Sequence, residues 1–173
     1  TFDYYRLNKI LSRIIRYPIK LQDRFNCSNI TNIISDSYYS NYQLKKIYNK
    51  KSNIIYPGMA SCTPRKLIIK NNYKSVSFGL LSMLKGHHIT SQIDPKTKIF
   101  GSPSHDNIDK YISINTYINK STITDYIKSK IYKSHSIFFA NQINEPFGIT
   151  TLEATNLDCF VLGRNEAGTC EII

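Results

Sequence analysis

Two carboxylates of this chain stand where they could bind a phosphorylated ligand. Glu145 lies in a loop after an apolar run, and Glu153 lies eight positions further on, inside an expected helix that Gly148 opens. Each carboxylate can accept hydrogen bonds from a pair of hydroxyl groups, and free amides at a helix N-terminus bind phosphate. A sugar and a ribose joined by a diphosphate would satisfy all three elements. Acidic residues that only cap the helix are the structural alternative.

A second candidate phosphate site lies in the segment 77–86. It reads as a strand, a turn at Gly79, and Lys85 close to the start of a short helix. A lysine at such a turn would hold a phosphate group, whereas a solvated lysine is the alternative.

The sequence has no carboxylate cluster suited to magnesium, and His87, His88 and the four cysteines lack the spacing of a metal site. We therefore expect no metal, and we interpret the cysteines as reduced thiols.

The elements around these residues alternate between strand and helix. Strands are expected over 76–79, 98–101, 112–118, 136–140 and 159–162. A short helix is expected to open at Lys85-Gly86, and further helices are expected over 123–132 and 148–156 and from Thr169 onward. This alternation predicts an α/β fold: a Rossmann-like parallel sheet with helices on both faces. In such sheets ligands bind outside the carboxyl ends of the strands, which is where Lys85 and Glu145 fall.

The first third of the chain has a different pattern. A basic amphipathic helix is expected from Tyr4 to Arg16 and should end at Pro18. A strand over 30–34, a helix over 40–48 and a strand over 53–56 follow, and 61–74 shows no clear period. We therefore divide the chain into a partial N-terminal domain segment (1–60), a linker (61–74) and a ligand-binding Rossmann-like domain (75–173).

The charge of the chain is unevenly distributed. Its 173 residues carry a formal charge of +11, and residues 1–85 alone carry 15 Lys and Arg against three Asp, a net charge of +12. This half is expected to face a nucleic acid, a membrane surface or a phosphorylated molecule, or to be a solvated basic surface. No apolar run approaches the ~18 residues of a membrane span, and no signal peptide is recognisable. A cytoplasmic location is the expectation.

Several segments along the chain resemble a known family. Glu145-Pro-Phe-Gly-Ile-Thr-Thr-Leu-Glu153-Ala154, Cys159-Phe-Val-Leu and Glu166-Ala-Gly-Thr-Cys-Glu-Ile-Ile173 resemble the C-terminal, donor-binding domain of retaining glycosyltransferases of family four. That family has the two-domain GT-B architecture. Upstream, Ser35-Asp-Ser37, Gln43–Tyr48 and Ile54–Gly58 resemble its passage out of the N-terminal domain, and Gly79–Gly86 resembles its phosphate-binding turn.

The resemblance implies roles for seven residues. Glu145 would contact hydroxyls of the transferred sugar, Glu153 the ribose, and Lys85 the diphosphate. Catalysis would rest on Glu145 and Lys85, without an essential metal or a separate cofactor, because cationic side chains and helix dipoles stabilise the leaving group. The donor-binding set is Gly79, Lys85, Glu145, Phe147, Gly148, Ile149 and Glu153.

Three positions depart from the family pattern. Leu80 stands where an Arg usually partners the Lys, Asp158 stands where a Gly usually precedes the strand at Phe160, and Ala167 replaces the first of a usual Gly pair. Most of the family's N-terminal domain, with its acceptor site, has no counterpart in these 173 residues. We therefore expect this chain alone to bind nucleotide diphosphate weakly and to transfer nothing.

The function implied by the resemblance is sugar transfer. A glycosyltransferase would move a sugar, with retention of configuration, from a nucleotide-diphosphate donor to a glycan, lipid or protein acceptor. The reaction is expected in the cytoplasm, with a peripheral contact at the inner face of a membrane as one use of the basic helix and burial of its apolar face as the other. Nucleic acid is not expected as a partner. The alternatives are a non-catalytic nucleotide-sugar or phosphate-binding module and a basic nucleic-acid-binding protein.

Overall fold

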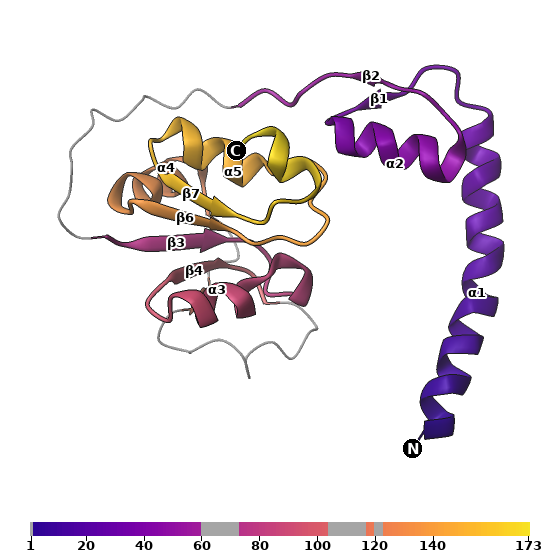
Figure 1. Cartoon of the computed structure of the whole chain (residues 1–173), viewed down its shortest axis with the longest axis horizontal. Helices are drawn as coiled ribbons and strands as arrows, with labels where there is room; N and C mark the ends of the chain where they lie inside the picture. The colour runs from indigo at the N-terminus through magenta and orange to yellow at the C-terminus, as the bar shows by residue number, and fades with distance from the viewer. Residues whose placement is uncertain (1, 60–72, 104–116, 120–122) are drawn as a thin grey trace.

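A computed structural model describes residues 2–59, 73–103, 117–119 and 123–173 of the chain. Its main feature is a five-stranded sheet in the order β5-β4-β3-β6-β7, in which every neighbouring pair is parallel. The strands are β3 (Ser75–Phe78), β4 (Lys98–Gly101), β5 (Tyr117–Asn119), β6 (Ile137–Ala140) and β7 (Phe160–Gly163). The chain runs outward from β3 through β4 to β5, then returns to β6 and β7 on the other side of β3. Figure 1 shows β4 and β6 on the two sides of β3.

Helices cover both faces of this sheet. On one face, α3 (His87–Ile93) lies against β3, where the side chains of Ser77 and His87 meet. On the other face, α4 (Asp125–Ser134) contributes Tyr132 to the core, and α5 (Ile149–Asn156) contributes Ala154 together with its C-cap residue Leu157. Two short 3-10 helices, η1 (Met83–Lys85) and η3 (Ala167–Glu171), follow β3 and β7. The expected α/β layers are confirmed.

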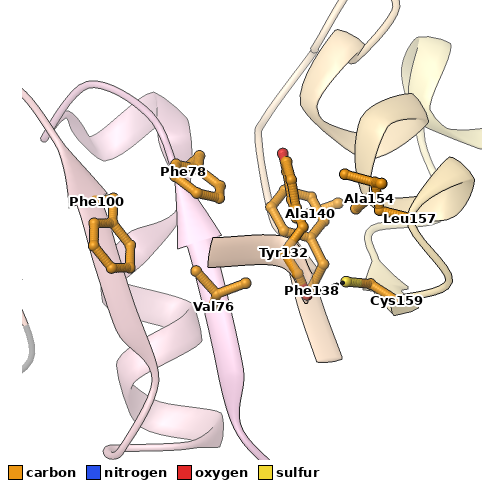
Figure 2. Close-up of a cluster of buried hydrophobic side chains, with 9 residues drawn as sticks. All are labelled: Val76, Phe78, Phe100, Tyr132, Phe138, Ala140, Ala154, Leu157 and Cys159. Carbon is orange, nitrogen blue, oxygen red and sulfur yellow. Dashed lines mark hydrogen bonds between the residues drawn. The ribbon is translucent and has the colours of Figure 1, made fainter. Parts of the chain in front are cut away.

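The core lies between the sheet and the pair α4 and α5. Alternate strand residues point into it, because successive side chains of a strand face opposite sides of a sheet. Phe78 stacks on Phe100 with ring centroids 5.4 Å apart, and the Tyr132 ring lies 4.9 Å from that of Phe78. Figure 2 shows the cluster of Val76, Phe78, Phe100, Tyr132, Phe138, Ala140, Ala154, Leu157 and Cys159.

The N-terminal region, residues 2–58, is built differently. It contains α1 (Phe2–Ser28), α2 (Tyr38–Tyr48) and a parallel pair of two-residue strands, β1 (Ile34–Ser35) and β2 (Asn53–Ile54). None of the residues of α2 is fully buried, and α1 stands out at the side of the molecule in Figure 1. Among the residues that the structure describes, no helix combines the length and the apolar content needed to cross a bilayer.

Two expectations for this region were wrong. The helix does not end before Pro18 but continues to Ser28 with the proline inside it, because a proline removes a single backbone donor, a loss that a long helix can absorb. The strand expected over 30–34 is confined to β1, because turn hydrogen bonds of Asn29 and Ile30 still close the end of α1.

The expected linker falls almost entirely on residues 60–72, and most of the strand expected over 112–118 falls on 104–116; both segments lie outside the described residues.

Candidate functional site

The candidate site lies at the carboxyl ends of β3 and β6. These two strands are neighbours, and the chain leaves them toward opposite edges of the sheet, which makes this the topological switch point of the fold. The loop after β3 and the loop after β6 are joined through their backbones, since the Ile143 amide donates to the Leu84 carbonyl at 2.8 Å. A crevice at such a point is where open α/β sheets bind ligands.

Lys85 and Glu145 meet at this point. The Lys85 Nζ lies 2.7 Å from Glu145 Oε2, although the two residues are 60 positions apart in the chain. About a third of the Lys85 side chain and a fifth of the Glu145 side chain remain exposed, so both groups can reach a ligand. The structure thus places a cation and a carboxylate side by side, in contact with solvent.

Two glycines shape the loop that carries Lys85. Gly79 has a φ of +148°, and a side chain there would lie 3.4 Å from the Lys85 methylene groups and from His87 Nε2. Gly86 has a φ of +67°, and a Cβ there would lie 2.0 Å from the Asn141 carbonyl oxygen. Glycine at both positions lets the loop adopt left-handed backbone and lets it approach the β6 loop closely.

The helix after Glu145 begins without a side-chain cap. Gly148, with a φ of +98°, is the N-cap residue of α5 and offers no side chain to its first turn. Phe147 is buried, whereas Ile149 is half exposed. The hydroxyls of Thr151 and Thr169 are buried close to Gly148 and have no hydrogen-bond partner. This helix start is therefore a polar, uncapped N-terminus, a type of site that favours anions.

Glu153 lies on the side of α5 that faces α4. Its Oε2 is 2.5 Å from Lys128 Nζ and accepts a hydrogen bond from the Tyr132 hydroxyl at 3.2 Å. The Thr150 carbonyl oxygen lies 3.0 Å from the same Tyr132 hydroxyl, so the single hydroxyl proton is shared between two acceptors. Glu153 is thus held by α4, and neither of these contacts joins it to the Lys85–Glu145 pair.

His87 is a fully buried histidine beside the Lys85 loop. Its Nδ1 lies 3.3 Å from the Ser77 hydroxyl. Burial, and in smaller part the positive charge of Lys85, lowers the pKa of His87 to about 4. The imidazole is therefore neutral at physiological pH, and it packs between β3 and α3 as an uncharged group.

The three departures from the family pattern have distinct structural settings. Leu80 is 46% exposed, so it does not fill the core; the neighbouring Leu81 does. Asp158 and Ala167 both have a φ of +57°, in the left-handed region that favours glycine. Glycine would adopt this backbone at lower cost at both positions, so Asp158 and Ala167 carry backbone strain that the resembled pattern would avoid.

Sequence reasoning found part of this arrangement. It identified Lys85, Glu145, Gly79 and Gly148, which the structure brings to one edge of the sheet. It missed Lys128 and Tyr132, because a lysine and a tyrosine on an amphipathic helix give no signal of a partner 20 or more residues away. Within the described ranges, no three His, Cys, Asp or Glu side chains gather to form a metal-binding group. The roles of the site residues, and independence from metal, stay predictions.

Comparison with known proteins adds information about the fold. No protein-family model and no curated protein matches the sequence. Among solved structures, the chain is similar to the sucrose-phosphate synthase from Thermosynechococcus elongatus, with a TM-score of 0.64 and 13% identity, over 86% of this chain and 44% of that one. It is also similar to TarM, with a TM-score of 0.57 and 11% identity, over 89% of this chain and 34% of that one.

These likenesses define a class of fold. The chain has the α/β architecture, a parallel sheet flanked by helices, that the C-terminal domains of GT-B glycosyltransferases share. It spans less than half the length of either solved chain. The expected fold class is therefore confirmed.

Proposed function

We propose that this chain is the donor-binding part of a glycosyltransferase. The reaction is the transfer of a sugar, with retention of configuration, from a nucleotide-diphosphate donor to a glycan, lipid or protein acceptor. The observation that carries the proposal is the Lys85–Glu145 pair at the switch point of the sheet, next to the uncapped start of α5. A cation for phosphate and a carboxylate for hydroxyls stand there within the reach of one ligand.

Each group has a role in this proposal. Lys85 neutralises the diphosphate as it leaves, and the backbone amides of Phe147, Gly148 and Ile149 surround the sugar and the phosphate. Glu145 accepts hydrogen bonds from the sugar hydroxyls. Glu153 holds the ribose after exchanging part of its contact with Lys128. In a retaining reaction of this kind the acceptor attacks the face that the diphosphate leaves, so no nucleophilic side chain, metal or cofactor is required.

The location that we propose is the cytoplasm, with a lipid-linked acceptor as one option. The basic helix α1 supports two uses, a peripheral contact with anionic lipid at the inner face of a membrane or packing against further protein. We favour packing, because its apolar side chains are more than half exposed along much of its length, for example Ile14, Ile15 and Phe25. A Debye length of about 8 Å at physiological salt would also weaken a purely electrostatic lipid contact.

The decisive test is calorimetric titration of the chain with UDP, GDP and ADP, each with and without attached glucose. We expect one nucleotide to bind, and we expect Lys85→Ala to weaken that binding by about 10- to 100-fold, as loss of a hydrogen bond to a charged group does. Lys74→Ala is the matched control, because Lys74 is an exposed lysine before β3, at the opposite end of that strand. Leu80→Arg should tighten binding by a similar factor, since its exposed position leaves room for the side chain.

A second variant separates the sugar from the nucleotide. Glu145→Gln should weaken the nucleotide sugar more than the free nucleotide, because its proposed partner is the sugar. Unchanged affinity in Lys85→Ala would contradict the phosphate assignment. Saturable binding of a nucleotide sugar without transfer, in a protein that includes the acceptor region, would favour the non-catalytic module. Salt-dependent retention on DNA without nucleotide binding would favour the nucleic-acid-binding alternative.

A further inference from the structure

Glu171, near the end of the chain, contacts the beginning of α2. Its Oε2 accepts a hydrogen bond from the Tyr38 amide at 2.9 Å, and its Oε1 accepts one from the Tyr39 amide at 2.8 Å. The Tyr56 hydroxyl donates to the same Oε2 at 3.0 Å. These partners lie 115 to 133 positions away in the sequence. One carboxylate thus links η3 to α2 and to the segment that follows β2.

The contact satisfies a need of α2. The first amides of a helix have no partner within it, and together they carry a partial positive charge. Helix α2 has no acidic residue in its own first turn, and its N-cap Ser37 accepts only from Ser40, at 3.0 Å. Glu171 supplies the missing acceptor and the negative charge from another part of the chain. A carboxylate is the strongest such partner, because the hydrogen bonds are charge-assisted.

Both η3 and the N-cap of α2 also contact the loop that carries Glu145. At the start of η3, the Gly168 amide donates to the Glu145 carbonyl at 2.9 Å, and a Cβ on Gly168 would lie 1.9 Å from the Pro146 carbonyl oxygen. From the other side, the Ser37 hydroxyl donates to the Pro146 carbonyl at 2.6 Å. The backbone at Glu145 and Pro146 is therefore held between η3 and the N-cap of α2.

Glu166 adds a third support to this loop. Its Oε1 accepts from the Asn144 amide at 3.3 Å, and Arg164 holds the carboxylate through two hydrogen bonds of 2.8 and 3.0 Å. Arg164 lowers the pKa of Glu166, which keeps the carboxylate charged. The Tyr56 ring, whose hydroxyl binds Glu171, also lies 5.5 Å from the Phe147 ring, centroid to centroid. Every residue from Asn144 to Phe147 thus has a contact with η3, its flanking residues or the N-terminal region.

We infer that Glu171 is a positioning residue that couples the N-terminal region to the Glu145 loop. The contacts close a ring: Glu171 holds the start of α2, Ser37 of α2 holds Pro146, and Gly168 of η3 holds Glu145. Loss of the Glu171 carboxylate removes the contact between η3 and α2, which spans the greatest distance in sequence. The Glu145 loop then loses the support that α2 gives it through Ser37. The effect on a sugar rests on the proposed function of Glu145, whereas the mechanical coupling itself does not.

Amide hydrogen exchange of the full chain, followed by NMR, tests the coupling. Glu171→Gln should raise the exchange rates of the Tyr38 and Tyr39 amides by about tenfold, and it should also raise that of the Gly168 amide, which Glu171 does not touch. Asp158→Asn is the matched control, because it removes an exposed carboxylate at a left-handed position that asparagine tolerates. Ser37→Ala opens the ring at another link and should raise the Gly168 rate as well. Faster exchange confined to α2 would show a local cap and overturn the coupling.

Ligand affinity provides the second readout. Glu171→Gln should weaken binding of the nucleotide sugar, titrated as the glucose conjugates of UDP, GDP and ADP, at least threefold more than binding of the matching nucleotide. A merely structural loss would weaken both equally, and equal losses would overturn the positioning role. If the unaltered chain binds none of these probes, the proposed function fails, while the exchange experiment still decides whether the coupling exists.

Discussion

The sheet region, residues 73–173, and the N-terminal region, residues 2–58, differ in what holds them together. The sheet region has a core of its own in which Val76 and Phe138 are completely buried. The N-terminal region buries no residue of α2, and its paired strands are two residues long. Large apolar side chains of α1 are exposed, among them Leu11, Ile14, Ile15, Ile19 and Phe25.

This difference indicates which part can be stable alone. A two-stranded sheet without a covered face is marginal in water, and an isolated amphipathic helix gains most of its stability from packing. The N-terminal region depends on other surfaces. Among the described residues, its contacts with the sheet region include hydrogen bonds of Glu171, Ser37 and Tyr39 and the packing of the Tyr56 ring against the Phe147 ring. The candidate site stands mainly on the sheet region, so it is built on the self-sufficient part of the molecule.

The sharpest test of this contrast compares two phenylalanines. Phe138→Ala should lower the free energy of unfolding by about 3–5 kcal/mol, because it leaves a cavity at a fully buried position. Phe25→Ala, at a side chain that is 64% exposed on α1, should change it by less than about 0.5 kcal/mol. Urea denaturation monitored by circular dichroism measures both. Similar losses in the two variants would mean that α1 is packed in solution, contrary to this structure.

The pH dependence of stability should originate in the sheet region. The pKa of His87 is about 4 in the folded chain and near 6.5 when unfolded, so the unfolded state binds more protons between these values. Stability should be full above pH 6.5 and fall as the pH decreases toward 4, by about 3 kcal/mol for this group. Denaturation curves from pH 7.5 to 4.5 measure the effect. His87→Gln should flatten the dependence, and an unchanged slope would assign it to other groups.

Backbone strain offers a smaller test within the sheet region. Ala167→Gly should raise the free energy of unfolding by about 0.5–1 kcal/mol, since a left-handed backbone costs alanine more than the added chain entropy costs glycine. The adjacent change Gly168→Ala is the control of opposite sign, because its Cβ would meet the Pro146 carbonyl. Thermal unfolding of both variants is the measurement. A destabilised Ala167→Gly would indicate that the strain is relieved in some other way.

The smallest effect is expected for membrane binding by the N-terminal region. If α1 serves to pack against protein, the chain should show little binding to vesicles of phosphatidylserine and phosphatidylcholine at 150 mM salt. Replacing Arg6, Lys9, Arg13 and Arg16 by Gln should then change little in a sedimentation assay. Strong, salt-sensitive binding that these replacements abolish would instead support the lipid contact, at about 1 kcal/mol per basic residue.

The two regions also differ in how well their sequence predicts their structure. Strand β4 was predicted at its observed bounds and α5 to within one residue, because Gly and Pro punctuate a regular alternation there. In α1, the proline wrongly indicated the end of the helix, because it removes a single backbone donor and the helix continues on both sides of it. The family resemblance pointed to Glu145 and Lys85, and the structure adds that they form an ion pair. The bonds of Glu171 to α2 could not be predicted, because contacts over 130 residues leave no local pattern.

The backbone contacts between the two loops of the site bear on how the protein tolerates mutation. The spacing of Lys85 and Glu145 depends on main-chain atoms, namely the Ile143–Leu84 hydrogen bond and the approach of Gly86 to the Asn141 carbonyl. Side chains at Leu84 and Ile143 can therefore be exchanged during evolution without moving the two charged groups apart. Such a spacing can persist while the side chains around it change.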